Sequence, residues 1–356
     1  TNDLFHLISL ASVNIILYIT FIYYVTLKII QTKNFNFNFI AIILFISFLL
    51  IKFARYREYG NDLIPLIVSI YFLIQIIELD KNKIFSKIDL LYISLPFFAF
   101  MFAHKISYIF ATLMFLPLIN NLETIKKIKP KYLFFFLIIF IPWILKNVIT
   151  TTCLAYPVVF TCFSNSLFEM QGIAEPSNAS WLTEIWAKGF IDHPNWETLN
   201  LEEYASGFNW VNTWLNGHFI KILEIISPLF FLILIFSLYL LFNRNKYLSK
   251  KLKANNQNNY FFLLVGIFIG LSIWFYKAPI FRYGSFYIIA FIIISYVSIL
   301  NYFFSAKNLG ELRFFKVIFI LSLFFLVIKN TIRINNSDLQ LFPKTVYNEN
   351  KQIFNK

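Results

Sequence analysis

Residues 222–242 read ILEIISPLFFLILIFSLYLLF, with Glu224 as the single charged side chain. A helix of about 20 residues crosses the ~30 Å hydrocarbon layer of a membrane, so this segment has the length and composition of a transmembrane helix. Its apolar side chains cover every face instead of alternating, which excludes the strands of a transmembrane barrel. The segment therefore predicts a helix that lies in a membrane.

Similar apolar segments follow one another along the whole chain. They cover residues 4–25, 37–51, 63–77, 88–102, 107–118, 132–145, 260–276, 285–304 and 317–328. With 59% apolar and 14% charged residues, the chain also departs from soluble proteins, in which about a quarter of the residues are charged. The sequence predicts an all-α protein, a polytopic transmembrane bundle of about ten helices.

The basic residues give this bundle an orientation. The net charge of +13 could indicate a nucleic-acid partner, but the lysines and arginines lie in short runs in every second loop, at residues 28–33, 81–87, 126–131, 244–253 and 307–316. Loops rich in lysine and arginine stay in the cytoplasm. We therefore expect a multi-pass membrane protein, with no nucleic-acid partner and with the complementary loops on the extracytoplasmic side.

One of those extracytoplasmic loops, residues 146–218, is long, acidic and rich in tryptophan. Its tryptophans are Trp181, Trp186, Trp196, Trp210 and Trp214. A disordered linker contains few aromatic residues, so we expect a small helical subdomain, with helices at residues 183–189 and 201–206 and tryptophans at the level of the lipid headgroups. The predicted organisation is helices one to six in residues 1–145, the subdomain in 146–218, helices seven to ten in 219–329 and a tail in 330–356.

Cys153 and Cys162 are the two cysteines, and both fall in this loop. An oxidising compartment permits a disulfide between them, whereas the simpler alternative is two small residues half-buried at the interface. Their spacing has no metal-binding signature.

The chain begins at Thr1, on the predicted extracytoplasmic side, and shows no signal-peptide pattern. We expect an N-terminal truncation, with at least one further helix and one extracytoplasmic loop before Thr1.

Charged residues beside apolar segments are costly, so each such cluster is a candidate site. Between the second and third segments lie Arg55, Arg57, Glu58 and Asp62. Arginine binds phosphate oxygens bidentately, and a carboxylate can hold a metal or orient a hydroxyl. The alternative is a solvated loop whose charges pair with one another.

Two further basic clusters lie in extracytoplasmic turns. His104 and Lys105 join the fourth and fifth segments, where Lys105 can contact a lipid phosphate or simply extend to the headgroups. Arg282 and Tyr283 follow Pro279 before the ninth segment, where a basic residue breaks the charge rule. We expect an anionic partner such as a lipid-linked phosphate, and the alternative is an ion pair with Glu58 or Asp62.

A last motif surrounds the end of the sixth segment. We expect that helix to end at Leu145, with Lys146 and Asn147 just outside it and Tyr156 and Pro157 turning the chain into the long loop.

With these residues the chain resembles a family of bacterial polytopic membrane proteins in the GT-C superfamily, whose members are glycosyltransferases that use polyprenyl-phosphate-linked sugars. The marks of the resemblance are Pro142-Trp143, Lys146-Asn147, Tyr156-Pro157, Gly60-Asn61-Asp62, Lys105, Ala278-Pro279 and Arg282-Tyr283. The resemblance implies that a carboxylate in the first extracytoplasmic loop is the general base, and that Asp62 with Glu58 corresponds to a second acidic site. It implies that the base lies in the missing N-terminal part.

The resemblance predicts transfer of a sugar from a polyprenyl-phosphate donor to a glycan, lipid or protein of the envelope. Arg55, Arg57, Lys105 and Arg282, with Tyr283, would bind the leaving phosphate, and a divalent cation is a candidate cofactor. A polysaccharide polymerase or ligase is a second enzyme class with this architecture, and a lipid flippase or transporter is a non-enzymatic one. An enzyme requires Asp62, Lys105 and Arg282 to meet at one extracytoplasmic pocket, whereas a transporter needs polar residues through the middle of the membrane.

Overall fold

The computed structural model describes residues 16–29, 37–52, 63–78, 87–118, 130–156, 158–163, 176–243, 257–304 and 312–335. Within these ranges the regular structure is helical, and the one strand-like pairing is an isolated bridge between Cys153 and Cys162. This confirms the predicted all-α fold.

Every predicted apolar segment forms a helix where the structure describes it. The helices are Ile16–Ile29, α2 (Phe37–Lys52), α3 (Leu63–Glu78), α4 (Lys87–His104), the 3-10 helix η2 (Ile106–Leu118), α6 (Pro130–Thr151), α10 (Ile220–Phe242), α12 (Gln257–Lys277), α13 (Phe281–Phe303) and α14 (Leu312–Asn335). Within the ranges given above, four helices are long and apolar enough to cross a membrane, namely Pro130–Thr151, Val211–Phe242, Tyr260–Lys277 and Phe281–Phe303. The protein is therefore a membrane protein.

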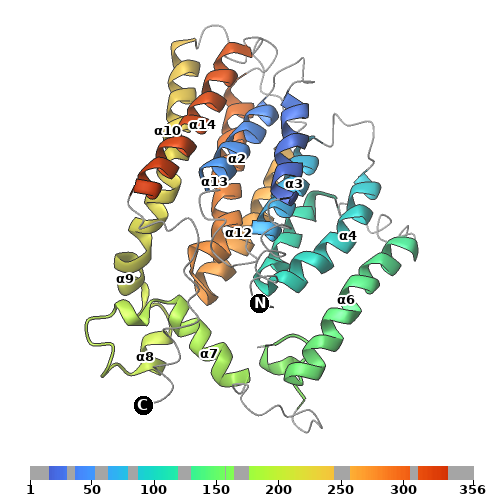
Figure 1. The fold of residues 1–356 in the computed structure, drawn as a ribbon, viewed down its shortest axis with the longest axis vertical. Coiled ribbons are helices and arrows are strands. Elements are labelled where there is room, and N and C mark those ends of the chain that lie inside the picture. The colour runs from blue at the N-terminus through green and yellow to red at the C-terminus, as the bar shows by residue number, and fades with distance from the viewer. Residues whose placement is uncertain are drawn as a thin grey trace.

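Helix α2 lies at the centre of the bundle. It packs against α3, α10, α13 and α14, and these helices run alongside it in Figure 1. Its side chains from Phe39 to Leu50 are buried, as expected for a helix that is apolar on all faces. Neighbours on several sides therefore exclude this helix from lipid.

Helix α6 has the opposite environment, because it lies at the edge of the bundle and packs against α4 (Figure 1). It has no buried residue, and large apolar side chains such as Phe134 and Phe135 are more than half exposed. In a membrane protein such a surface faces lipid.

The predicted end of α6 at Leu145 is wrong, because the helix continues through Lys146 and Asn147 to Thr151. Pro142 lies inside it, and transmembrane helices tolerate proline where other groups satisfy the backbone. Side chains stabilise the last turns by donating to carbonyls one turn earlier: Asn147 Nδ2 to Trp143 O at 3.1 Å and Thr151 Oγ1 to Asn147 O at 2.7 Å.

Glycines let α12 approach its neighbours closely. A Cβ atom at Gly266 would lie 2.2 Å from the carbonyl oxygen of Leu113 in η2, and one at Gly270 would lie 2.7 Å from the ring of Tyr287 in α13. The Tyr287 hydroxyl in turn donates to the carbonyl oxygen of Ser107 at 2.7 Å. This contact fixes the start of η2 against α13.

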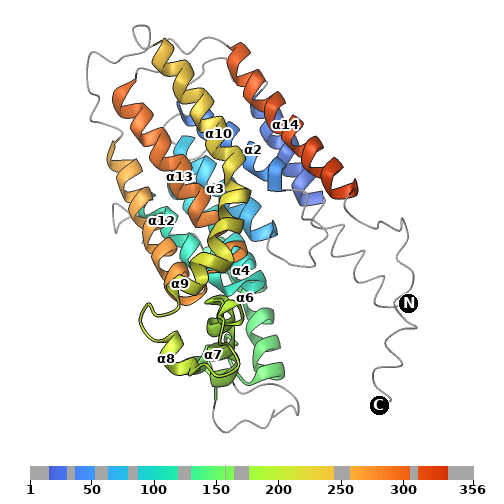
Figure 2. The same cartoon turned by 90° about the vertical axis from the view of Figure 1, so that its left-hand side faces the viewer.

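The long loop forms a helical subdomain at one end of the bundle, which we call the subdomain end (Figures 1 and 2). It contains η3 (Val159–Thr161), α7 (Pro176–Ala187), η4 (Phe190–Asp192), α8 (Leu201–Ala205), α9 (Val211–Trp214) and the π-helical turn η5 (Leu215–Phe219). The expected helices at residues 183–189 and 201–206 correspond to α7, which begins earlier, and to α8. Because α9, η5 and α10 are continuous, the subdomain joins the bundle through an unbroken helix.

The prediction that all the loop tryptophans lie at the headgroups is wrong for two of them. Trp210 and Trp214 are 0% and 5% exposed and pack against Phe275 of α12, with ring centroids 5.2 Å away in both cases. Trp181, Trp186 and Trp196 are exposed. The buried pair instead joins the subdomain to the bundle.

Candidate functional site

The turn between α12 and α13 carries one half of the candidate site. Only Ala278, Pro279 and Ile280 connect the two helices. Arg282 and Tyr283 therefore lie in the first turn of α13, whereas the sequence analysis had placed them in the loop before it. The backbone N–H of Tyr283 donates to the carbonyl oxygen of Ile280 at 2.9 Å. A helical first turn therefore sets the direction of both side chains.

Lys105 supplies the other half. As predicted, a very short turn joins α4 and η2, because Lys105 alone separates them. Its backbone N–H donates to Met101 O at 2.9 Å, and its carbonyl accepts from the N–H of Tyr108 at 3.0 Å. These bonds hold the backbone on both sides of the turn and so fix the direction in which the Lys105 side chain leaves it.

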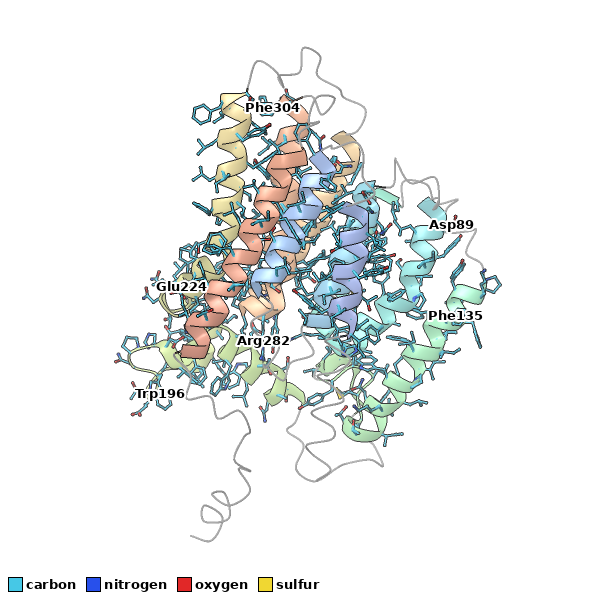
Figure 3. The ribbon with its side chains drawn as sticks, turned by 45° about the horizontal axis from the view of Figure 1, so that its top comes forward. Asp89, Phe135, Trp196, Glu224, Arg282 and Phe304 are labelled. Carbon is cyan, nitrogen blue, oxygen red and sulfur yellow. A yellow bond between two sulfur atoms is a disulfide. The ribbon has the colours of Figure 1, made fainter. Side chains whose placement is uncertain are left out.

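These two turns, far apart in sequence, meet at the ring of Tyr283. The Lys105 Nζ atom lies 3.8 Å from the ring centroid and the Arg282 Cζ atom lies 5.0 Å from it. Arg282 Nη2 also donates to the Tyr283 hydroxyl at 3.1 Å. Cations within about 6 Å of a ring are attracted to its face, so Tyr283 holds two positive charges together. Figure 3 labels Arg282 at the subdomain end and Phe304 at the opposite end.

Indole groups hold the turn that precedes Arg282. Trp214 Nε1 donates to Pro279 O at 2.6 Å, and Trp274 Nε1 donates to Ile280 O at 2.9 Å. Gly284 lies so close to the Trp274 indole that a Cβ atom there would be 2.1 Å from it. The Pro279 carbonyl thus accepts an indole N–H from the subdomain, and the Ile280 carbonyl accepts one from α12. These two hydrogen bonds fix the turn to both elements.

A carboxylate shared by two lysines makes a second link between the subdomain and α12. Glu184 of α7 accepts from Lys188 Nζ at 2.6 Å and from Lys277 Nζ, at the end of α12, at 3.2 Å. Lys188 is 1% exposed, and it also donates to Ala205 O at 2.9 Å. A buried ammonium needs such partners, because removing it from water is costly.

A hydrogen bond within the subdomain also holds the backbone of Lys188, because the Tyr204 hydroxyl donates to the carbonyl oxygen of Lys188 at 2.8 Å. Burial raises the pKa of the Tyr204 phenol, the Asp192 charge raises it further, and a hydrogen bond with Thr213 lowers it. The phenol therefore stays a neutral donor at physiological pH.

Lys105, Arg282 and Tyr283 together are suited to an anion. A guanidinium binds phosphate through a planar pair of N–H donors, and an ammonium adds a compact charge. A phenol can donate to an oxygen of the same group. The geometry can therefore bind and neutralise a phosphate at the subdomain end of the bundle.

Other predicted site residues fall elsewhere. Arg55, Arg57, Glu58, Asp62 and Pro157 lie outside the described residues, so the meeting of Asp62 with Lys105 and Arg282 stays a prediction. Over the part of the chain that the structure describes, no group of three or more His, Cys, Asp or Glu side chains could hold a metal ion.

The motif of the sixth segment is part of α6. Trp143 stacks on Phe140 and packs on Phe102 of α4, with centroids 5.7 Å and 4.7 Å apart. Phe102 lies one turn before Lys105. The motif thus supports α4, the helix that leads to the site. Lys146 is exposed on α6, and Tyr156 follows α6 in the chain.

Sequence reasoning missed Glu184, Lys188 and Trp214. Each was one member of an acidic, tryptophan-rich loop, and nothing in the order of residues showed which carboxylate or indole faces the bundle. The one available signal was the lysine at position 188, an isolated basic residue four positions after Glu184, which is the spacing of a helical ion pair.

Comparisons with known proteins place the chain in a family. A search of curated proteins and a search of solved structures gave no significant match. A family model matches residues 4–289, which include all the described contacts of Lys105, Arg282 and Tyr283. The chain therefore belongs to the family described as Domain of unknown function (DUF8201).

Proposed function

We propose that this protein is a GT-C-type membrane glycosyltransferase of the bacterial inner membrane. It transfers a sugar from a polyprenyl-phosphate donor to an envelope glycan, lipid or protein on the extracytoplasmic face. The observation that carries the proposal is the meeting of Lys105 and Arg282 at Tyr283, at the end of the bundle that bears the subdomain, which we assign to the extracytoplasmic side.

The chemistry of sugar transfer explains why such a cluster is needed. When an acceptor hydroxyl attacks the anomeric carbon, negative charge accumulates on the departing phosphate. Cations held in place before the reaction stabilise that charge without reorganising. Lys105 and Arg282 would supply this stabilisation, and Arg55 and Arg57 are further candidates for it.

Acid–base chemistry is assigned to carboxylates outside the described residues. A base must remove the proton of the acceptor hydroxyl. We assign a supporting acidic role to Asp62 and Glu58. A divalent cation is a candidate partner of these carboxylates, since carboxylate oxygens are its usual ligands.

The interior of the described spans favours an enzyme over a transporter. The buried polar side chains inside these apolar helices carry no charge. They are those of Ser47, Ser69, Gln75, Ser94, Ser285 and Ser322. The ion pair between Lys28 and Glu78 is only partly buried and lies at the ends of its helices. A path for an anionic lipid would need charged or strongly polar groups through the middle of the membrane.

Binding of a polyprenyl phosphate tests the site directly. In nanodiscs, Lys105→Gln and Arg282→Gln should each weaken retention of undecaprenyl phosphate, measured by native mass spectrometry, by about tenfold or more, the loss of one charge-assisted contact. Lys131→Gln is the matched control, because Lys131 also lies over a tyrosine ring, 4.9 Å from the Tyr132 centroid, but on α6. Equal retention by all the variants would contradict the assignment of the phosphate site.

Deletion of the full-length gene tests the reaction. Mass spectrometry of envelope lipids and glycans should show an accumulating lipid-linked sugar and a glycan that lacks that sugar. Loss of polymer length with intact repeat units would instead indicate the polymerase or ligase. A donor that accumulates on the cytoplasmic leaflet, with no missing enzymatic step, would indicate the flippase.

A further inference from the structure

A small closed loop follows the end of α6. Cys153 and Cys162 form a disulfide, and their backbones also pair as an isolated antiparallel bridge. Of the alternatives left open by the sequence, the structure has the disulfide. We call residues 153–162 the disulfide loop.

Internal hydrogen bonds make the disulfide loop self-supporting. The N–H of Leu154 donates to Thr161 O at 3.0 Å, and the N–H of Phe163 donates to Thr152 O at 3.0 Å. The Thr161 hydroxyl accepts from the N–H of Ala155 at 3.2 Å and donates to Val158 O at 2.7 Å. Because these bonds satisfy several polar groups within the loop, the loop can present an apolar surface.

The surface that the loop presents is strongly apolar. Phe160 is 91% exposed, Val159 and Phe163 are 51% and 53% exposed, and Leu154 is 40% exposed. No charged residue lies between Lys146 and Glu169 in the sequence. A cluster of exposed apolar side chains without charge marks an interaction surface.

Its position identifies the partner. The loop begins two residues after α6, whose own exposed side chains, including Leu145 and Ile149, form the lipid-facing surface described above. The apolar side chains of the loop therefore follow directly on a helix whose exposed surface is already assigned to lipid. Aromatic residues just outside a span are typical of the headgroup region.

We propose that the disulfide loop, whose η3 turn also contacts α7, inserts Phe160 and its apolar neighbours into the extracytoplasmic lipid leaflet and so helps to fix the end of α6. Helix α6 packs mainly on α4, so a lipid contact at its end stabilises an otherwise peripheral helix. The disulfide keeps the apolar side chains on one side of the loop. This inference does not rest on the glycosyltransferase proposal.

Photo-crosslinking in native membranes tests the partner. A Phe160→p-benzoylphenylalanine variant should form phospholipid adducts, seen by mass spectrometry, in a yield comparable to that of the same substitution at Phe135, an exposed residue of the second turn of α6. The substitution at Glu203, an exposed residue of α8, should give several-fold less lipid adduct. A yield at position 160 as low as at 203, or adducts at 160 with another protein, would overturn the proposal.

The disulfide is tested in the same membranes. Replacing both cysteines by serine, together with the photo-reactive residue at position 160, should lower the lipid adduct several-fold and leave the yield at position 135 unchanged. Unchanged adduct at position 160 would show that the disulfide does not hold the loop in lipid. The yield at position 135 also reports whether the variant is still inserted in the membrane.

Discussion

Glu184 is the single residue on which the link between subdomain and bundle depends most. It neutralises Lys188, which is 1% exposed, and it also accepts from Lys277. Glu184→Ala should destabilise the protein by about 3 kcal/mol, because it leaves a buried ammonium without its counter-charge. The measurement is the midpoint of thermal unfolding in detergent.

Two variants separate charge from packing at this site. Lys277→Met should cost only ~0–1 kcal/mol, because its ammonium is 60% exposed and its ion pair is screened by water. The double variant Glu184→Gln with Lys188→Met should recover much of the stability lost in Glu184→Ala. If Glu184→Ala is no less stable than Lys277→Met, the buried pair is not structurally important.

Trp214 makes the corresponding neutral contact. Trp214→Phe keeps the aromatic packing but removes the indole N–H that donates to Pro279 O at 2.6 Å. The buried carbonyl then lacks a donor, which costs about 1–3 kcal/mol. Hydrogen exchange of the amides of residues 277–284 should become faster, whereas Trp181→Phe, at an exposed position, should leave it unchanged.

At the level of elements, hydropathy predicted the helices well. Segments such as 37–51 and 63–77 became α2 and α3 with ends shifted by a residue, because the apolar runs stop where the helices leave the membrane. The predicted end of α6 was wrong because the apolar run stops at Leu145, whereas side chains such as Asn147 extend the helix beyond it. The apolar run thus marks the membrane part of a helix, whereas its last turns depend on hydrogen bonds between side chains and the backbone.

The site was only partly predictable for a different reason. The charge rule marked Arg282 as an exception, and the very short turn between two apolar segments marked Lys105. Both signals can be seen in the sequence because they are local. That the two residues meet at Tyr283 depends on how η2 packs against α12 and α13, which is decided by contacts such as Tyr287 with Ser107. The burial of Trp210 and Trp214 depends on the same tertiary packing.

Gly266 tests that packing. Gly266→Ala should stabilise an isolated helix by about 1 kcal/mol, because alanine is the better helix former. Here the added Cβ would lie 2.2 Å from the carbonyl oxygen of Leu113, so we expect a net loss of about 1–3 kcal/mol from overpacking. Thermal unfolding in detergent measures the sign, and a stabilised variant would contradict the close contact of α12 with η2.

At the scale of the whole molecule, the subdomain, the α12–α13 turn and the disulfide loop belong to one side of the membrane. Indole and lysine contacts join the first two, and the loop lies at the end of α6 that precedes the subdomain. A disulfide persists in an oxidising compartment, so it agrees with the extracytoplasmic side that the basic loops predict. Two independent properties, thiol chemistry and charge distribution, therefore favour the same orientation.

Reporter fusions test this orientation in cells. Alkaline phosphatase, which is active only outside the cytoplasm, should be active when inserted after Glu197 in the subdomain. It should be inactive when fused after Asn243 or Phe304, which follow the ends of α10 and α13 that lie away from the subdomain. Green fluorescent protein should show the reverse pattern, because it folds poorly when exported unfolded. Phosphatase activity after Asn243 would invert the topology. It would place Lys105 and Arg282 in the cytoplasm, where an extracytoplasmic sugar transfer at these residues is impossible.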